Sequence, residues 1–186
     1  FKNSKTLNRV TLLASTKVEK EAFYGCEQLA SIAAHQINEI GESAFENCIQ
    51  LSNANVLMVN SIGVKAFAGC YNLRQIVTEE GRLTDIGEKA FYNCSELCFA
   101  IPDSVMAIGS QAFTGIANNK FFVPKNAEVS PDAIDEEVAI YTVEGAKITT
   151  NSAYPSYTIL KTPGHLRTLS GDVLTYAASG ETVPTI

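Results

Sequence analysis

A phrase of about 22 residues recurs along the chain and constrains the fold more than any other feature. The dipeptide Ala-Phe occurs five times, and successive phenylalanines lie 22, 22, 24 and 22 residues apart, at Phe23, Phe45, Phe67, Phe91 and Phe113. A fixed period between about 20 and 50 residues is typical of repeat architectures. The sequence therefore predicts an array of stacked units.

The array extends beyond these five copies. Two partial copies keep the same internal spacing, one made of Phe1, Leu7 and Val10 and the other of Val129, Ala133 and Ile134. The chain thus holds about six copies, of which the first is truncated and the last degenerate. Because it opens inside a repeat, we expect further residues upstream in a longer protein.

Each unit combines a short alternating segment with a Gly-x-x-Ala-Phe-x-x-Cys turn. The alternating segments have the inward pairs Val10/Leu12, Ile32/Ala34, Ala54/Val56, Ile76/Thr78, Phe99/Ile101 and Phe121/Val123. Alternation with a period of two predicts a short strand, whereas the apolar spacing of the turn favours one turn of helix. Since such a unit cannot bury its apolar face alone, copies are expected to stack at ~4.8 Å into a solenoid with a parallel sheet along one side.

The phrases "INEIGESAFENCIQL", "LTDIGEKAFYNCSEL" and "IPDSVMAIGSQAF" resemble the BspA-like branch of the leucine-rich repeat family. The resemblance covers roughly Phe1 to Val143, and it departs from the family pattern where Ile116 replaces a Cys. It implies an α/β-type right-handed superhelix that is mostly β with short helical turns. Members of this family are typically secreted or displayed on the surface of bacteria, and several are linked to adhesion.

The repeat pattern is lost from Glu144 onward, where Ser and Thr become frequent and Cys is absent. The predicted domains are therefore the repeats, residues 1–143, and a β-rich segment, residues 144–186. Turn signals in this segment separate the β-type stretches Tyr157–Leu160, His165–Leu169 and Val173–Tyr176. We expect it to cap the last coil; the alternative is the beginning of a second domain.

Four cysteines occupy one repeat position: Cys26, Cys48, Cys70 and Cys94. Stacking places neighbouring members about 5 Å apart, which leaves a disulfide or a metal site open on spacing alone. Their place beside the core Phe, and the apolar Ile116 at the same position in the next copy, favour buried thiols. The glycine that follows each core Ile is expected to form a tight bend.

Catalytic signals are weak. Cys98 is expected to point outward from its strand, and only His35 and His165 could serve as a base. A hydrolase would need these distant residues to converge. We therefore predict a protein that is not an enzyme and that needs no cofactor or metal.

The outward positions of the stacked strands form the candidate binding face, because stacking turns them into one continuous surface. Its candidate residues are Arg9, Ser31, Asn53, Asn55, Gln75, Lys120 and Phe122, with Phe122 as the aromatic anchor. Most are small or polar, so the face suits a protein or glycan. The alternative is a sheet face that only keeps the protein soluble.

Composition limits the partners further. The formal charge is −6, from 20 acidic and 14 basic residues without a run of like charge, which argues against nucleic acid. No apolar stretch approaches the ~20 residues of a membrane span. We therefore predict a secreted or cell-surface module that binds a protein or glycan of a host or another cell. A structural spacer that holds another domain away from the cell envelope is the alternative.

Overall fold

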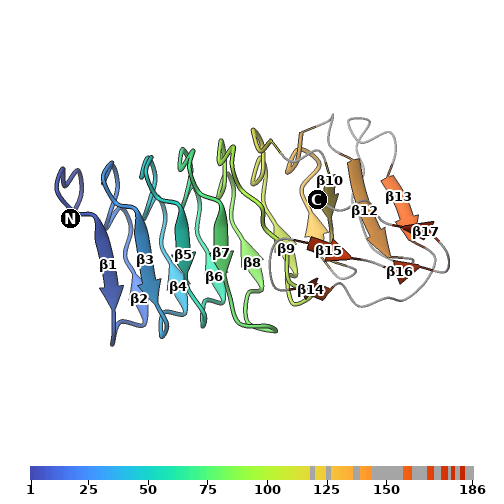
Figure 1. Cartoon of the computed structure of the whole chain (residues 1–186), viewed down its shortest axis with the longest axis horizontal. Coiled ribbons are helices and arrows are strands. Elements are labelled where there is room, and N and C mark those ends of the chain that lie inside the picture. The colour runs from blue at the N-terminus through green and yellow to red at the C-terminus, as the bar shows by residue number, and fades with distance from the viewer. Residues whose placement is uncertain are drawn as a thin grey trace.

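In the computed structural model the repeats stack into a solenoid (Figure 1). The structure describes residues 1–117, 120–124 and 127–135, and the backbone of the strands beyond them, 139–143, 157–160, 167–169, 173–175, 177–178 and 181–182. One coil is formed by each copy of the repeat. The predicted parallel-sheet solenoid is confirmed.

Two parallel sheets run along the solenoid. The wide sheet has the order β1-β3-β5-β7 and consists of β1 (Arg9–Leu12), β3 (Ser31–Ala34), β5 (Asn53–Asn55) and β7 (Gln75–Val77). The narrow sheet has the order β11-β9-β8-β6-β4-β2 and consists of β2 (Lys17–Val18), β4 (Glu39–Ile40), β6 (Ser61–Ile62), β8 (Asp85–Ile86), β9 (Ala107–Ile108) and β11 (Glu128–Val129). Each strand pairs in register with its equivalent in the next coil, as Ile32 does with Ala54. Residues that lie one repeat apart in the sequence are therefore paired in the sheets.

The core lies between the two sheets and the turn that joins them. Its centre is a column of stacked phenylalanine rings, with centroids 5.2 Å apart between Phe23 and Phe45 and again between Phe45 and Phe67. Leu29, Leu51 and Leu73 are completely buried beside this column. Full burial of such side chains is worth about 1.5–3 kcal/mol each, so stacking of coils supplies the stability that a single coil lacks.

The predicted helical turn does not form, and the described residues contain no helix. In the coil of Phe45 the turn contains two residues with left-handed backbone, Ser43 at φ 53° and Asn47 at φ 60°. A right-handed helix cannot pass through such residues. Turn amides bond to the next coil, as the N–H of Phe45 does to the carbonyl of Ala66 at 2.8 Å. The turn therefore extends the ladder between coils.

The glycines after the core isoleucines allow close approach between coils, a role that the sequence analysis did not predict. A Cβ on Gly87 would lie 2.8 Å from the backbone carbonyl carbon of Gly63 and from the amide nitrogen of Val64. Such contacts are shorter than van der Waals packing allows. Glycine is needed here because one coil rests directly on the backbone of the previous one.

The predicted strand with the inward pair Phe99/Ile101 is wrong in part. Ile101 is buried and Phe99 packs against the core, as expected from the alternation. However, residues 98–101 form no strand, and the wide sheet ends at β7. The reason is a shift of one residue in the alternation. In the coil of β7, the first inward residue, Ile76, comes three positions after the repeat leucine Leu73. In the next coil, the first inward residue, Phe99, comes only two positions after the repeat leucine Leu97. A shift of one residue turns every side chain to the opposite face and breaks the pairing.

Beyond the interruption, a third parallel sheet has the order β10-β12-β13, from β10 (Lys120–Phe122), β12 (Ala139–Val143) and β13 (Tyr157–Leu160). We call it the C-terminal sheet. Two antiparallel pairs follow: β14 (Arg167–Leu169) with β15 (Val173–Thr175), and β16 (Ala177–Ala178) with β17 (Glu181–Thr182). β-structure in the last segment agrees with the sequence. Parallel pairing of β13 with β12 crosses the predicted boundary at Val143, and the division into repeats and cap stays a prediction.

Among the residues that the structure describes, no helix is long and apolar enough to span a membrane.

Candidate functional site

Four of the predicted face residues lie in one column on the outer surface of the wide sheet. Pairing aligns Arg9 with Ser31, Ser31 with Asn53, and Asn53 with Gln75. Arg9, Asn53 and Gln75 are exposed, and none of the described residues covers them. Parallel strands lie about 4.8 Å apart, and equivalent side chains repeat at that interval along the solenoid.

A second outward column runs beside the first and consists of Thr11, Ala33, Asn55 and Val77. The intervening residues, such as Ile32 and Ala54, are buried, which confirms the predicted alternation. Together the two columns form the outward face of the wide sheet, which we call the polar face.

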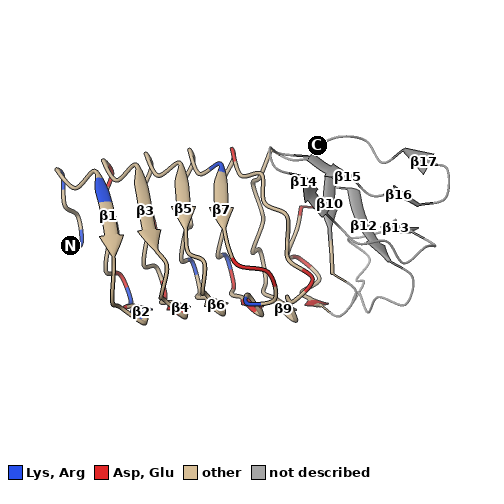
Figure 2. Ribbon diagram, turned by 60° about the horizontal axis from the view of Figure 1, so that its bottom comes forward, with Lys and Arg blue, Asp and Glu red and all other residues tan. Residues whose placement is uncertain are grey.

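The polar face presents hydroxyl and amide groups with little charge. Arg9 is its only ionisable residue, and the ribbons of β3, β5 and β7 carry no charged side chain in Figure 2. Asn53 donates from Nδ2 to the Oγ of Ser52 at 2.9 Å, which fixes one side of its amide. The Oδ1 of Asn55 is buried and has no hydrogen-bond partner within the described residues. The amides that this face exposes to a partner are therefore those of Asn53 and Gln75.

Lys120 and Phe122 do not lie on the same sheet as the other candidates. Their backbone forms β10, the first strand of the C-terminal sheet, and the interruption at residues 98–101 separates it from β7. The predicted continuous surface is thus divided. The side chains of Lys120 and Phe122 lie outside the described part of the structure, so an anchoring role for Phe122 stays a prediction.

The repeat cysteines are packing residues with a polar contact. Cys26, Cys48, Cys70 and Cys94 are completely buried, as the sequence predicts. Each donates a hydrogen bond from Sγ, at 3.1 Å, to the carbonyl oxygen of a Phe in the preceding coil. Burial raises the pKa of the Cys48 thiol to about 12 and shifts that of Cys70 in the same direction. A thiol of this kind is a poor nucleophile at neutral pH.

Within the part of the chain that the structure describes, His35 is not brought into a site with Cys98. Cys98 is exposed, as predicted, at the interruption of the wide sheet. His35 is exposed in the loop after β3, and His165 lies outside the described residues.

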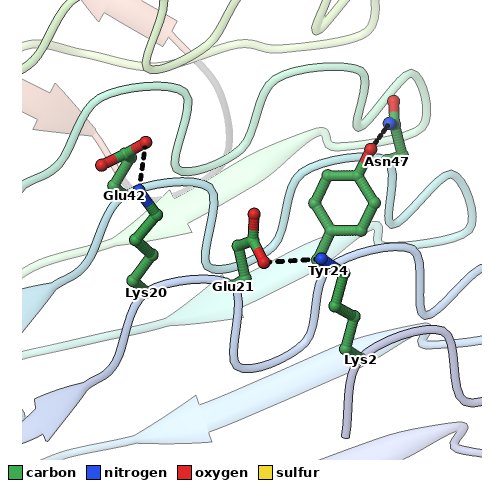
Figure 3. Close-up of polar contacts among 6 residues, drawn as sticks. All are labelled: Lys2, Lys20, Glu21, Tyr24, Glu42 and Asn47. Atoms are coloured by element: carbon green, nitrogen blue, oxygen red, sulfur yellow. Dashed lines mark hydrogen bonds and ion pairs between the residues drawn. The ribbon is translucent and has the colours of Figure 1, made fainter.

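Charged residues of adjacent coils form ion pairs near the start of the solenoid (Figure 3). Lys2 lies 2.6 Å from Glu21, and Lys20 lies 2.9 Å from Glu42. These hydrogen bonds lower the pKa of Glu21 and raise that of Lys20. The Nζ of Lys2 also lies 4.9 Å from the ring centroid of Tyr24. Because partners in adjacent coils neutralise these charges, the cluster supports stacking rather than offering an open site for an ion.

One residue beside the polar face did not appear among the sequence candidates. Arg74 precedes β7, is exposed, and lies 4.0 Å from Glu96. Its position directly before the strand, equivalent to Ser52 and Ala30, was the signal that could have identified it. Arg9 in β1 and Arg74 before β7 therefore place one guanidinium on each side of the uncharged strands β3 and β5.

The chain matches the BspA type leucine rich repeat region over residues 1–120, in six copies. Its fold is similar to that of a leucine rich repeat protein of T. pallidum, with 24% identity, a TM-score of 0.58, and coverage of 74% of each chain. It is also similar to a leucine-rich repeat protein from Bacteroides ovatus, with 22% identity and a TM-score of 0.50, covering 79% of this chain and 52% of that one. None of the curated protein sequences matches the chain. These similarities support the solenoid fold.

Proposed function

Because the chain belongs to the BspA-type leucine-rich repeat family, we propose that it is a non-enzymatic module that binds a protein partner through the polar face. The exposed column Arg9–Ser31–Asn53–Gln75 carries this proposal, since it joins equivalent residues of four coils into one surface. Solenoid proteins commonly bind their partners on surfaces built in this way.

The chemistry of the face supports a partner that is recognised by hydrogen bonds. Amide and hydroxyl groups can donate to and accept from the backbone and polar side chains of another protein. A glycan could use the same groups, and direct binding experiments distinguish the two partners.

A catalytic role has little support in the described residues. The thiols of Cys48, Cys70 and Cys94 are held in the neutral form by burial. The leucine-rich repeat solenoid is typically a binding scaffold. We therefore place the activity of this chain in recognition.

We further propose that the module acts outside the cell or on the cell surface, where it mediates adhesion to a host or to another cell. The family relationship is the support for this location. In the alternative function the solenoid is a structural spacer. Regular stacking from β1 to β7 would suit a spacer equally well, and the polar face would then only keep the protein soluble.

The experiment is a binding assay with immobilised collagen, immobilised laminin and an array of neutral glycans. We expect saturable binding to a matrix protein, and loss of that binding when Asn53→Arg and Gln75→Arg are combined. The control is Ser61→Arg, which lies on the narrow sheet outside the polar face. If binding is absent, or if the control variant loses as much binding as the face variant, the polar face is not the recognition surface.

A further inference from the structure

The wide sheet and the C-terminal sheet are separated by one segment, residues 98–101, that pairs as a strand with neither of them. We propose that this segment is a hinge about which the polar face and the C-terminal sheet change their relative inclination. The inference rests on the pairing of the coils and does not depend on the identity of the partner.

The interruption is confined to the wide-sheet side of the solenoid. Among the described residues, the backbone hydrogen bond that joins this segment to the preceding coil runs from the N–H of Cys98 to the carbonyl of Arg74 at 3.0 Å. At the equivalent positions of two earlier coils, three residue pairs join β3 to β5, and the first of them is Ser31 with Asn53. The coil that contains residues 98–101 is therefore weakly attached along this one edge.

The same two coils are firmly attached everywhere else. On the narrow sheet Asp85 pairs with Ala107, and the strands β8 and β9 continue the ladder without a break. In the turn, the N–H of Phe91 donates to the carbonyl of Ala112 at 2.8 Å. At the corner between the sheets, the Oγ of Ser104 donates to the carbonyl of Leu83 at 2.7 Å. Residues 98–101, which form no strand, are then the loop residues that could absorb a change of backbone angles, as the residues of a hinge do.

The phase of the side chains explains why the ladder stops. In β7, Gln75 is exposed and the residue after it, Ile76, is buried. At the equivalent positions of the next coil this order is lost, because Phe99 packs against the core and Ala100 is only partly buried. Backbone N–H and C=O groups alternate with the side chains, so this shift turns them away from the partners that β7 would offer. The segment keeps its first rung at Cys98 and loses the following ones.

The ring of Phe99 adds a distortion at the same place. Its centroid lies 5.8 Å from that of Phe91, with the planes inclined by 48°. The next ring of the column, Phe113, is inclined by 19° to Phe91, whereas Phe23 and Phe45 are inclined by 1°. The column remains stacked through the hinge region, but its alignment changes where Phe99 enters.

A hinge here would let the outer surface of the solenoid open or close while the narrow sheet acts as the axis. The polar face moves as one unit because β1, β3, β5 and β7 are paired throughout. The C-terminal sheet moves as the other unit. Such bending changes the curvature that the outer surface presents to a partner.

The test measures distances between pairs of spin labels that lie two coils, or about 10 Å, apart, by the dipolar broadening of continuous-wave electron resonance spectra. In a Cys98→Ser background, one pair crosses the hinge on the wide-sheet side, at Gln75→Cys and Lys120→Cys. A second pair spans the same coils on the narrow sheet, at Asp85→Cys and Glu128→Cys. A third lies within the polar face, at Ser31→Cys and Gln75→Cys. We expect a broad distance distribution for the first pair and narrow ones for the other two.

A variant that restores the phase completes the test. Phe99→Gln combined with Ala100→Ile gives this coil the Gln-Ile sequence that β7 has at positions 75 and 76. The first pair should then show a distribution as narrow as that of the third. A narrow distribution for the first pair before restoration, or an unchanged broad one afterwards, would overturn the hinge.

Hydrogen exchange provides a measurement on the unaltered protein, in case the restored variant does not fold. We expect the amides of residues 99–101 to exchange at least tenfold faster than those of Ile32 and Ala34. The amides of Ala107 and Ile108 in the same coil should remain protected. Equal protection of residues 99–101 and Ile32 would contradict the hinge.

Discussion

The Oδ1 of Asn47 lies 2.5 Å from the place that a Cβ on Gly69 would occupy. The two residues hold the same position in adjacent coils, and both have left-handed backbone, with φ 60° at Asn47 and φ 71° at Gly69. The arrangement recurs along the solenoid, where this position reads Asn3, Gly25, Asn47, Gly69, Asn93 and Gly115. An Asn in one coil therefore requires a Gly in the next, and the structural repeat at this position is two coils long.

We expect Gly69→Ala to be destabilising for two separable reasons. The left-handed backbone costs about 1–2 kcal/mol for any residue with a Cβ, and the new methyl group collides with the Asn47 amide. Urea denaturation should show a larger loss than for Gly81→Ala, a control with φ 76° and no atom within 4 Å of the new Cβ. Adding Asn47→Gly to Gly69→Ala should recover the difference. If the changes in unfolding free energy of the two single variants simply add in the double variant, the contact between Asn47 and residue 69 does not matter for stability.

The phenylalanine column predicts a strong dependence of stability on position. Phe67 is completely buried between Phe45 and Phe91, so Phe67→Ala should lower the free energy of unfolding by about 3–5 kcal/mol. Phe1 holds the same repeat position but is 78% exposed, and Phe1→Ala should cost far less. Thermal denaturation of the two variants gives the comparison. Equal losses would mean that the column does not carry the stability of the stack.

Alkaline pH should destabilise the protein through the cysteine column. Burial raises the pKa of Cys48 from about 9 to about 12 in the folded state. The neutral thiol therefore contributes its full stability below the unfolded pKa, and this contribution falls as the pH rises from about 9 toward 12. Cys48→Val should flatten that part of the profile of unfolding free energy against pH. The opposite result, an unchanged slope, would indicate that Cys48 is not protected in the folded protein.

Alkylation should distinguish the cysteines by their exposure. Iodoacetamide at pH 8 should modify the exposed Cys98 in the folded protein and leave the four buried thiols intact, because reaction needs an accessible thiolate. Mass spectrometry should show a single adduct before unfolding and five adducts afterwards in denaturant. Rapid modification of Cys70 in the folded state would contradict the burial of the column.

Much of the fold followed from the sequence because a strict period fixes which residues stack. The inward Ile32 and the outward Asn53 were placed by alternation alone, and the column of cysteines by its position beside the core Phe. Local turn geometry was less accessible. The helical spacing at Ala44, Phe45 and Cys48 was misleading, since left-handed residues such as Asn47 turn the chain toward the next coil.

The candidate site was found in part. Arg9, Ser31, Asn53 and Gln75 were correctly placed in one column, whereas Lys120 was assigned to a surface that the structure divides. The phase change after Leu97 was visible in the sequence as a spacing of two instead of three to the next core residue. Its effect on the sheet depends on backbone pairing, which no single unit displays.

The sequence by itself determined the repeat, the solenoid, and the residues that face inward, since these follow from period and hydrophobicity. Only the tertiary structure decided where adjacent coils pair, where the wide sheet stops, and why Gly69 must follow Asn47. The physical reason is that these features arise from contacts between coils a few ångströms apart. Such contacts depend on backbone direction and side-chain volume in two coils at once.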